Sequence, residues 1–233
     1  MKLALTSDFP TTANAAVIDA IRGAAADPRI AWIPPVTSQG RERFPAARER
    51  FALLGLARLE YCDIDEAPDE QQLARLVDHD VIYLTGGDPV VFLDRLRRRE
   101  LAVRLQDCAA AGRWIVGASG GAMQVTRNVS LYRLLNVPVD DVVADRGRFE
   151  ALGLVDCELL PHLNRMDLAM REAVREYSEH IDHDVIALAD GAALLHVDGE
   201  VRCTGVAMRF RRGTSSGLRS EAGAGARDTK PLP

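Results

Sequence analysis

Residues 114–122 read Trp-Ile-Val-Gly-Ala-Ser-Gly-Gly-Ala, an apolar run that leads directly into a serine with a glycine two residues to either side. This spacing is typical of a nucleophile elbow, in which a serine lies at a sharp turn between a strand and a helix. Gly117 and Gly121 are small enough for the strand and the helix to approach closely. The helix N-terminus places backbone N–H groups beside Ser119, where they can stabilise an oxyanion. A turn that only packs tightly or binds a phosphate has the same glycines, so both interpretations stay open here.

Around this turn, short apolar runs alternate with longer amphipathic ones, which is the pattern of parallel strands joined by crossover helices. We expect strands over residues 3–6, 30–33, 58–62, 81–85 and 114–118. We expect helices between them over residues 13–25, 41–56, 69–77 and 90–111. The first half of the chain is therefore predicted to be a doubly wound sheet, with Ser119 after its fifth strand.

The second half is predicted in less detail. Residues 131–147 are interpreted as largely irregular, with Asp140, Asp141 and Asp145 in a loop. A helix over residues 166–180 is expected to precede strands over 185–188, 193–197 and 205–210. The Asp198-Gly199 pair is a hairpin signal and favours antiparallel pairing at that point.

The C-terminal stretch differs in composition from the rest of the chain. Residues 212–233 are rich in glycine, serine, alanine and charge and show no apolar periodicity. Such composition is typical of disorder. We therefore expect one α/β domain over residues 1–211 and a disordered tail over 212–233.

Composition excludes several classes of function. The chain has 233 residues, of which 47% are hydrophobic and 27% charged, as in an ordinary soluble globular protein. A formal net charge of −5 argues against a nucleic-acid partner, which would favour a basic face. The N-terminus lacks the long apolar segment of a signal peptide, and no apolar run is long enough to cross a membrane. We expect a cytoplasmic protein that acts on a small molecule without binding nucleic acid or a membrane.

The four cysteines are far apart in the sequence. Cys62, Cys108, Cys157 and Cys203 form no Cys-x-x-Cys pair, so neither a zinc site nor a redox motif is indicated. We expect them to be reduced and mostly buried. No metal and no other cofactor is expected.

A serine nucleophile needs a base near neutral pH, and histidine has the suitable pKa. His79 lies between two aspartates and is expected to be a solvated loop residue. His180 and His183 end a predicted helix, where capping explains them. His196 alternates with apolar residues and is expected in a strand, at the core or an edge. His162 directly follows the apolar run Leu-Leu-Pro, as expected for a side chain at the carboxyl edge of a sheet.

A second predicted strand also ends in glycines, in the stretch Tyr-Leu-Thr-Gly-Gly-Asp-Pro over residues 83–89. In doubly wound sheets, ligands bind beyond the carboxyl ends of the strands. The Gly86-Gly87 pair can bring backbone N–H groups next to a substrate carbonyl, as an oxyanion hole requires. A tight turn without this role explains the same pair.

Four motifs occur in one order along the chain: the stretch over residues 82–89, the elbow over 117–122, a stretch ending in Leu-Pro-His over 152–162, and Ile-Ala-Leu-Ala-Asp-Gly-Ala-Ala-Leu over 186–194. This set resembles the dipeptidase E and cyanophycinase family of serine peptidases over about residues 1–210. The resemblance implies the fold of class I glutamine amidotransferases, a flavodoxin-like three-layer sandwich with a doubly wound, mostly parallel sheet flanked by helices. It also implies a Ser, His, Glu or Asp triad in that chain order.

By position in these motifs, the resemblance implies that Ser119 is the nucleophile, His162 the base and Asp190 the acid. The N–H groups of Gly120 and of Gly87, with Gly86 as the alternative to Gly87, are the implied oxyanion hole. Two positions depart from the family pattern. The family acid is a glutamate, and Asp190 is one methylene shorter, so the backbone must lie closer to His162. The family usually has alanine after the serine, and Gly120 keeps the N–H but loosens the turn.

The implied activity is that of a serine peptidase that cleaves small peptides, or β-aspartyl and other isopeptide bonds, through an acyl-enzyme. Relatives favour an N-terminal aspartate or cleave β-aspartyl-arginine bonds, and act as monomers or homodimers. Asp88 and Arg165 are the candidate substrate contacts. Arg165 can meet a substrate carboxylate in a bidentate pair. A surface arginine paired with Asp167 or with solvent is the alternative for Arg165.

Two other functions fit parts of the pattern. An α/β-hydrolase esterase has the order Ser, acid, His, with the acid from Asp140, Asp141 or Asp145 and the base from His180, His183 or His196. No His-Gly-Gly segment precedes the elbow, and this reading leaves the Gly86-Gly87 pair unexplained. A non-catalytic member of the same fold that binds a small molecule or a partner protein is the second alternative, since fold does not determine function.

Overall fold

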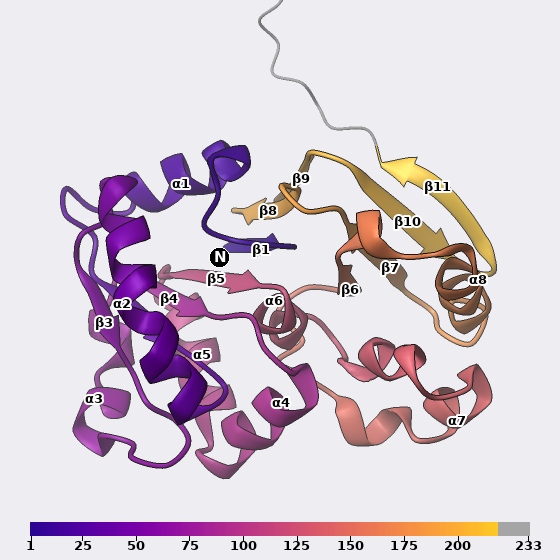
Figure 1. Cartoon of the computed structure of the whole chain (residues 1–233), viewed down its shortest axis with the longest axis horizontal. Helices are drawn as coiled ribbons and strands as arrows, with labels where there is room; N and C mark the ends of the chain where they lie inside the picture. The colour runs from indigo at the N-terminus through magenta and orange to yellow at the C-terminus, as the bar shows by residue number, and fades with distance from the viewer. Residues whose placement is uncertain (219–233) are drawn as a thin grey trace, which may run out of the picture.

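The computed structural model describes residues 1–218 and contains two sheets that lie side by side (Figure 1). The first is a 7-stranded sheet in the order β3-β2-β4-β5-β1-β8-β9. Its strands are β1 (Lys2–Thr6), β2 (Ile30–Ile33), β3 (Leu59–Tyr61), β4 (Val81–Leu84), β5 (Trp114–Ala118), β8 (Ala193–Val197) and β9 (Glu200–Thr204). The first five pair in parallel, while β8 and β9 are antiparallel additions. All five strands expected in the first half are present, with no end displaced by more than one residue.

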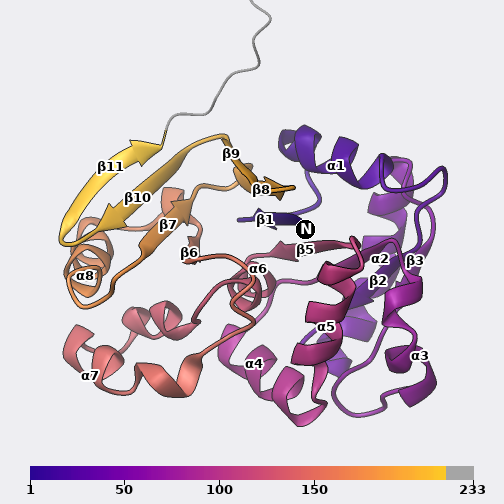
Figure 2. The ribbon, with the colours of Figure 1, turned by 180° about the vertical axis from the view of Figure 1, so that it is seen from behind.

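Helices cover both faces of this sheet. The short η1 (Thr12–Asn14), α1 (Ala15–Arg22) and α2 (Thr37–Leu53) belong to one side. On the other side are α3 (Glu70–Ala74), η2 (Leu76–Asp78), α4 (Pro89–Arg98) and α5 (Leu101–Ala110). Alternate strand residues enter the two apolar clusters, so Leu3 and Leu5 face α4 and α5 while Ala4 faces α1 and α2. The predicted doubly wound fold is therefore confirmed, and both views show it (Figures 1 and 2).

The second sheet has four strands in the order β11-β10-β7-β6. These are β6 (Cys157–Pro161), β7 (Asp184–Leu188), β10 (Ala207–Arg211) and β11 (Thr214–Leu218). Only β6 and β7 are parallel. Helix α8 (Leu168–Tyr177) packs against this sheet through Val174 and Tyr177, in an apolar cluster with Val185, Ala187 and Phe210. This sheet and its helices form the second half of the molecule.

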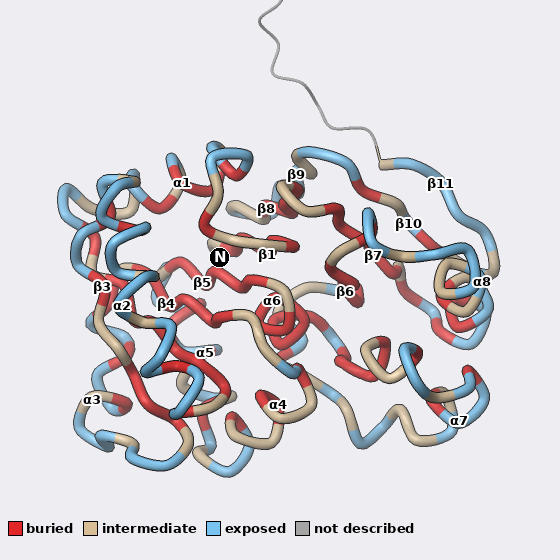
Figure 3. The backbone as a smooth tube through the Cα atoms, in the orientation of Figure 1, coloured by how far each residue is buried: buried red, intermediate tan, exposed pale blue. Residues whose placement is uncertain are grey.

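Helix α6 (Gly120–Val125) lies at the junction of the two halves (Figure 1). All of its residues are buried, and it contacts β1, β5, β6 and α4. Figure 3 shows the same burial for β4 and β5 beside it. The elbow at the start of α6 is thus held by strands of both sheets.

Two expectations about helices are corrected. The helix predicted over residues 90–111 is two helices, because Glu100 adopts a left-handed conformation with φ of 52° and breaks it. Residues 131–147 contain η3 (Ser130–Leu135) and α7 (Val139–Ala144) and enter η4 (Arg146–Phe149). Asp140 and Asp141 lie in the first turn of α7, where carboxylates suit the helix dipole, and not in a loop.

The C-terminal strands also differ from expectation. The Asp198-Gly199 turn joins β8 to β9, a strand that was not expected, while β10 pairs with β7 and β11. Strand β11 lies inside the stretch predicted to be disordered, so that prediction is wrong for residues 214–218. The burial of β11 shows the reason, because it is mostly exposed and carries no apolar alternation. Residues 219–233 lie outside the described part of the chain. Within residues 1–218, no helix combines the length and apolar character needed to cross a membrane.

Candidate active site

Ser119 occupies the turn between β5 and α6. Its backbone has φ of 51° and ψ of −119°, a conformation that a residue with a side chain adopts only under constraint. The Ser119 N–H donates to the carbonyl oxygen of Thr6 at 2.9 Å, which ties the turn to β1. A Cβ at Gly121 would lie 2.2 Å from the carbonyl oxygen of Leu84, so only glycine fits there. The turn therefore has the geometry expected of a nucleophile elbow.

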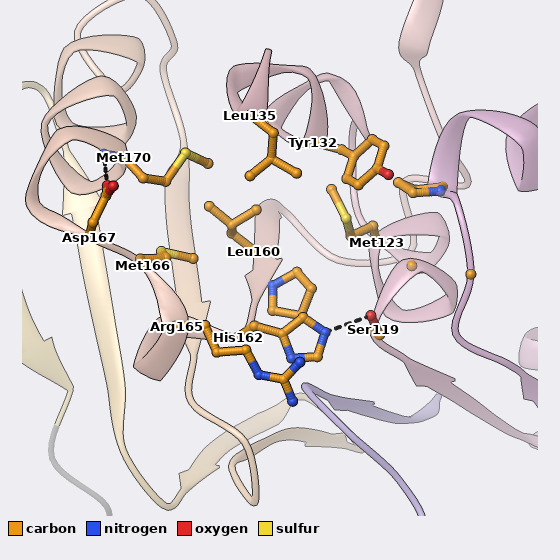
Figure 4. A pocket seen from close by; sticks show the side chains of 14 residues that line it. Ser119, Met123, Tyr132, Leu135, Leu160, His162, Arg165, Met166, Asp167 and Met170 are labelled. Atoms are coloured by element: carbon orange, nitrogen blue, oxygen red, sulfur yellow. Dashed lines mark hydrogen bonds between the residues drawn. The ribbon is translucent and has the colours of Figure 1, made fainter.

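Ser119, His162 and Asp190 come together from the ends of three strands, β5, β6 and β7. The Ser119 Oγ lies 3.0 Å from His162 Nε2 (Figure 4). On the other side of the ring, His162 Nδ1 lies 2.6 Å from Asp190 Oδ1. All three residues are partly exposed.

Ser7, which the sequence did not single out, hydrogen-bonds to both His162 and Asp190. Its hydroxyl donates to Asp190 Oδ1 at 2.8 Å and accepts the backbone N–H of His162 at 2.8 Å. The next residue, Asp8, accepts the N–H of Gly191 at 2.6 Å. A signal was present in the sequence, because both residues directly follow β1, whose neighbour β5 carries the nucleophile. Strand ends that meet at one sheet edge share a site.

Arg165 also binds Asp190. Its Nε and Nη2 donate to Asp190 Oδ2 at 2.9 and 2.6 Å, so its partner is neither Asp167 nor solvent alone. Asn164 donates to the same oxygen at 3.3 Å and accepts the Asp190 N–H at 2.8 Å. The carboxylate of Asp190 is thereby held on both of its oxygens.

These contacts act on the ionisation of Asp190. Burial by itself would raise the pKa of the Asp190 carboxyl, but hydrogen bonds from neighbouring side chains, first that of His162, outweigh burial and hold this pKa well below its ordinary range. Asp190 is therefore ionised at neutral pH. An ionised carboxylate only accepts hydrogen bonds, so His162 Nδ1 carries the proton in their shared bond.

The Gly86-Gly87 turn lies beside the elbow. A Cβ at Gly120 would fall 2.1 Å from the carbonyl oxygen of Gly87, so the two backbones are in direct contact. The alanine usual in the family does not fit this packing, which explains the glycine. Asp88 is exposed and caps α4, where its Oδ1 accepts the N–H groups of Val90 and Val91.

A cavity of about 330 Å³ opens at Ser119 and His162 (Figure 4). Its other walls are Gly87, Pro89, Gly120, Met123, Tyr132, Leu135, Leu160, Pro161, Arg165, Met166, Asp167 and Met170. Asp88 is not among them, but it neighbours Tyr132, where burial and then Asp88 raise the pKa of the phenol. Most of the wall is apolar.

The remaining histidines lie away from this cavity. His183 is buried and contacts Glu158 at 2.9 Å, so it does not cap a helix as expected. His79 is buried against Glu60 at 3.1 Å, which corrects its expected solvation. His196 lies on β8 and His180 follows α8. The esterase order is contradicted, because the histidine at Ser119 is His162.

The cysteines agree with expectation. Cys62, Cys108 and Cys157 are buried, Cys203 is half-buried, and all four are free. Burial raises the pKa of the Cys62 and Cys157 thiols to about 12. Within the described residues, no group of His, Cys, Asp and Glu side chains is placed to hold a metal ion.

Comparisons with known proteins identify the fold and the family of this chain. Two solved structures share the fold. A putative peptidase E protein from Listeria monocytogenes has a TM-score of 0.66 at 23% identity, over 87% of this chain and 97% of that one. A peptidase from an acI-B1 actinobacterium has a TM-score of 0.70 at 17% identity, over 94% of each chain. Peptidase E of Streptomyces coelicolor is 30% identical over 179 residues, 72% of this chain and 70% of the relative. An uncharacterised peptidase of Listeria innocua is 26% identical over 153 residues, 62% of this chain and 72% of the relative. A model of peptidase family S51 matches residues 3–204. The chain therefore belongs to peptidase family S51, the serine peptidases that include peptidase E and cyanophycinase.

Proposed function

We propose that this chain hydrolyses small peptides, at α-peptide, β-aspartyl or other isopeptide bonds, through an acyl-enzyme on Ser119. His162 is the general base and Asp190 its acid partner. The observation that carries the proposal is the continuous path of two hydrogen bonds, 3.0 Å from Ser119 Oγ to His162 Nε2 and 2.6 Å from His162 Nδ1 to Asp190. Both distances are within the reach that proton transfer needs.

The tautomer of His162 suits this role. Because ionised Asp190 accepts a hydrogen bond from the Nδ1–H of His162, the neutral ring has a free lone pair at Nε2, which faces the Ser119 hydroxyl. When Nε2 accepts the serine proton, the imidazolium is stabilised by the carboxylate on its other side. The strained elbow holds the hydroxyl in place during this transfer.

The reaction then proceeds in two displacements. Ser119 Oγ forms a bond to the substrate carbonyl carbon while its proton passes to His162 Nε2. The tetrahedral intermediate breaks the C–N bond, and His162 returns the proton to the departing amine. Water next attacks the acyl-enzyme, giving its proton to His162, and the ester bond to Ser119 breaks as the hydroxyl recovers that proton. The products are an amine and a carboxylic acid.

The N–H groups of Gly87 and Gly120 are the proposed oxyanion hole. Both glycines line the cavity at Ser119, and neither N–H donates to another of residues 1–218. The carbonyl of Gly86 accepts the Thr85 hydroxyl at 3.1 Å. In a trans peptide the N–H points opposite to the carbonyl, so the Gly87 N–H points away from Thr85.

The two departures from the family pattern are accommodated, which favours an enzyme over a non-catalytic binding protein. The shorter Asp190 still reaches His162, helped by the Ser7 hydroxyl between them. Gly120 is the residue that the contact with Gly87 requires.

The test is hydrolysis of a peptide panel by the wild-type chain, Ser119→Ala, His162→Ala and the control His180→Ala. The panel contains aspartyl dipeptides, β-aspartyl peptides and dipeptides of other residues. We expect kcat/KM to fall by about 10⁴-fold or more in the first two variants. His180 is exposed and outside the cavity, so its variant should retain activity. Peptide turnover that survives Ser119→Ala would overturn the proposal.

A further inference from the structure

We propose that the cavity beside Ser119 receives a large apolar side chain next to the cleaved bond, so that preferred peptides carry leucine, methionine or phenylalanine there and not aspartate. This inference rests on the proposed peptidase function and adds the class of substrate. It departs from the aspartyl specificity that the family resemblance implies.

The walls of the cavity come from both halves of the molecule. Met123 lies one turn along α6 from Ser119, and Leu160 is the residue of β6 two before His162. Met166 lies just before α8 and Met170 in its first turn, and Tyr132 belongs to η3 (Figure 4). A side chain that enters here from a carbonyl at Ser119 is therefore surrounded by thioethers, aliphatic groups and an aromatic ring. Methionines adapt to apolar groups of different shape.

The charged groups in the described wall have partners of their own. The positive charge of Arg165 is balanced by Asp190, to which its Nε and Nη2 both donate. The carboxylate of Asp167 caps α8, where it accepts the N–H of Met170 at 2.8 Å. An aspartyl side chain in the cavity would thus lose water without gaining an unbalanced cation, which disfavours it.

The exposed part of the cavity wall is apolar as well. Leu135 is 56% exposed although it is a large apolar residue, and it lines the cavity together with Tyr132. Exposed apolar surface in the wall of a cavity favours binding of an apolar ligand. The volume of about 330 Å³ is within the range of small-molecule pockets.

The primary experiment compares dipeptides that differ at one residue, X-Ala and Ala-X, with X as leucine, methionine, phenylalanine, aspartate or lysine. We expect kcat/KM for the apolar residues to exceed that for aspartate by at least about tenfold in one of the two series. Equal or higher kcat/KM for aspartate in both series would overturn the inference.

A pair of variants locates the preference. Leu135→Lys places an ammonium at the rim and should lower the leucine-to-aspartate ratio of kcat/KM by about tenfold. Leu168→Lys is the matched control, since Leu168 is 83% exposed but does not line the cavity, and its ratio should stay at the wild-type value. Equal ratios in the two variants would contradict the assignment.

Binding separates this inference from the proposed function. Calorimetry with Ser119→Ala measures the Kd of the same peptides without any turnover. Tighter binding of the leucine than of the aspartate peptide supports the apolar cavity even if the wild-type chain cleaves none of them, in which case only the function fails. Ser119-dependent cleavage with an aspartate preference would support the function and overturn the inference.

Discussion

Replacing Gly120 by alanine tests the packing behind the elbow. The added Cβ would lie 2.1 Å from the Gly87 carbonyl oxygen, whereas real Cβ contacts essentially never fall below 3.0 Å. The elbow and the Gly86-Gly87 turn must therefore separate by about 1 Å, and a displacement of that size at a reacting group costs about 100-fold in rate. Because Gly87 and Gly120 are the proposed oxyanion donors, the loss of activity should be a loss of kcat.

The assay is kcat/KM for the best peptide of the panel, measured beside the melting temperature. We expect Gly120→Ala to lose about 100-fold in kcat/KM, and about 1–3 kcal/mol of stability from overpacking. Gly147→Ala is the control, because a Cβ there meets nothing within 4 Å. If Gly120→Ala kept kcat/KM within about twofold of the wild type, the two turns would be free to move apart and the reasoning would be refuted.

Three further predictions concern Ser7, Asp190 and the Arg146–Glu158 ion pair. Ser7→Ala should lower kcat by about tenfold with little change in KM. The reason is that it removes the hydroxyl that donates to Asp190 and leaves the backbone N–H of His162 without its acceptor. A change in KM alone would contradict this prediction. Because the pKa of Asp190 is lowered, its ionised form stabilises the fold at pH values above the ordinary carboxyl pKa of 3.8, and this contribution is lost as the pH falls below that value. Asp190→Asn should therefore lower the melting temperature more at pH 7 than at pH 3. Arg146→Ala should lower the free energy of unfolding in urea by about 3–5 kcal/mol, because it leaves the fully buried Glu158 without its guanidinium partner. An unchanged urea midpoint would show that Tyr177 and His183 alone stabilise the buried carboxylate.

The first half of the fold could be predicted because its signals are local. Strands buried on both faces appear as continuous apolar runs, and β2 and β5 were expected with their observed bounds. The elbow was equally readable, since its glycines are required by backbone contacts within a few residues and by the adjacent strand. His162 could be placed at the site because it directly follows an apolar strand.

The remainder depends on contacts between distant parts of the chain. Asp-His-Asp around His79 is polar in sequence, yet His79 is buried because Glu60 reaches it from β3. Strand β11 has no apolar face, and only its pairing with β10 makes it a strand. The place of Ser7 after β1 indicates the sheet edge, but its hydrogen-bond partners, His162 and Asp190, lie 155 and 183 residues away and no local pattern identifies them.

The central claim, that His162 activates Ser119 as a nucleophile, is tested most directly by a fluorophosphonate reagent followed by intact-mass and peptide mass spectrometry. The account predicts one adduct on Ser119 in the wild-type chain and at least about 100-fold slower labelling in His162→Ala. The absence of an adduct, an adduct on another residue, or equally fast labelling of His162→Ala would contradict it.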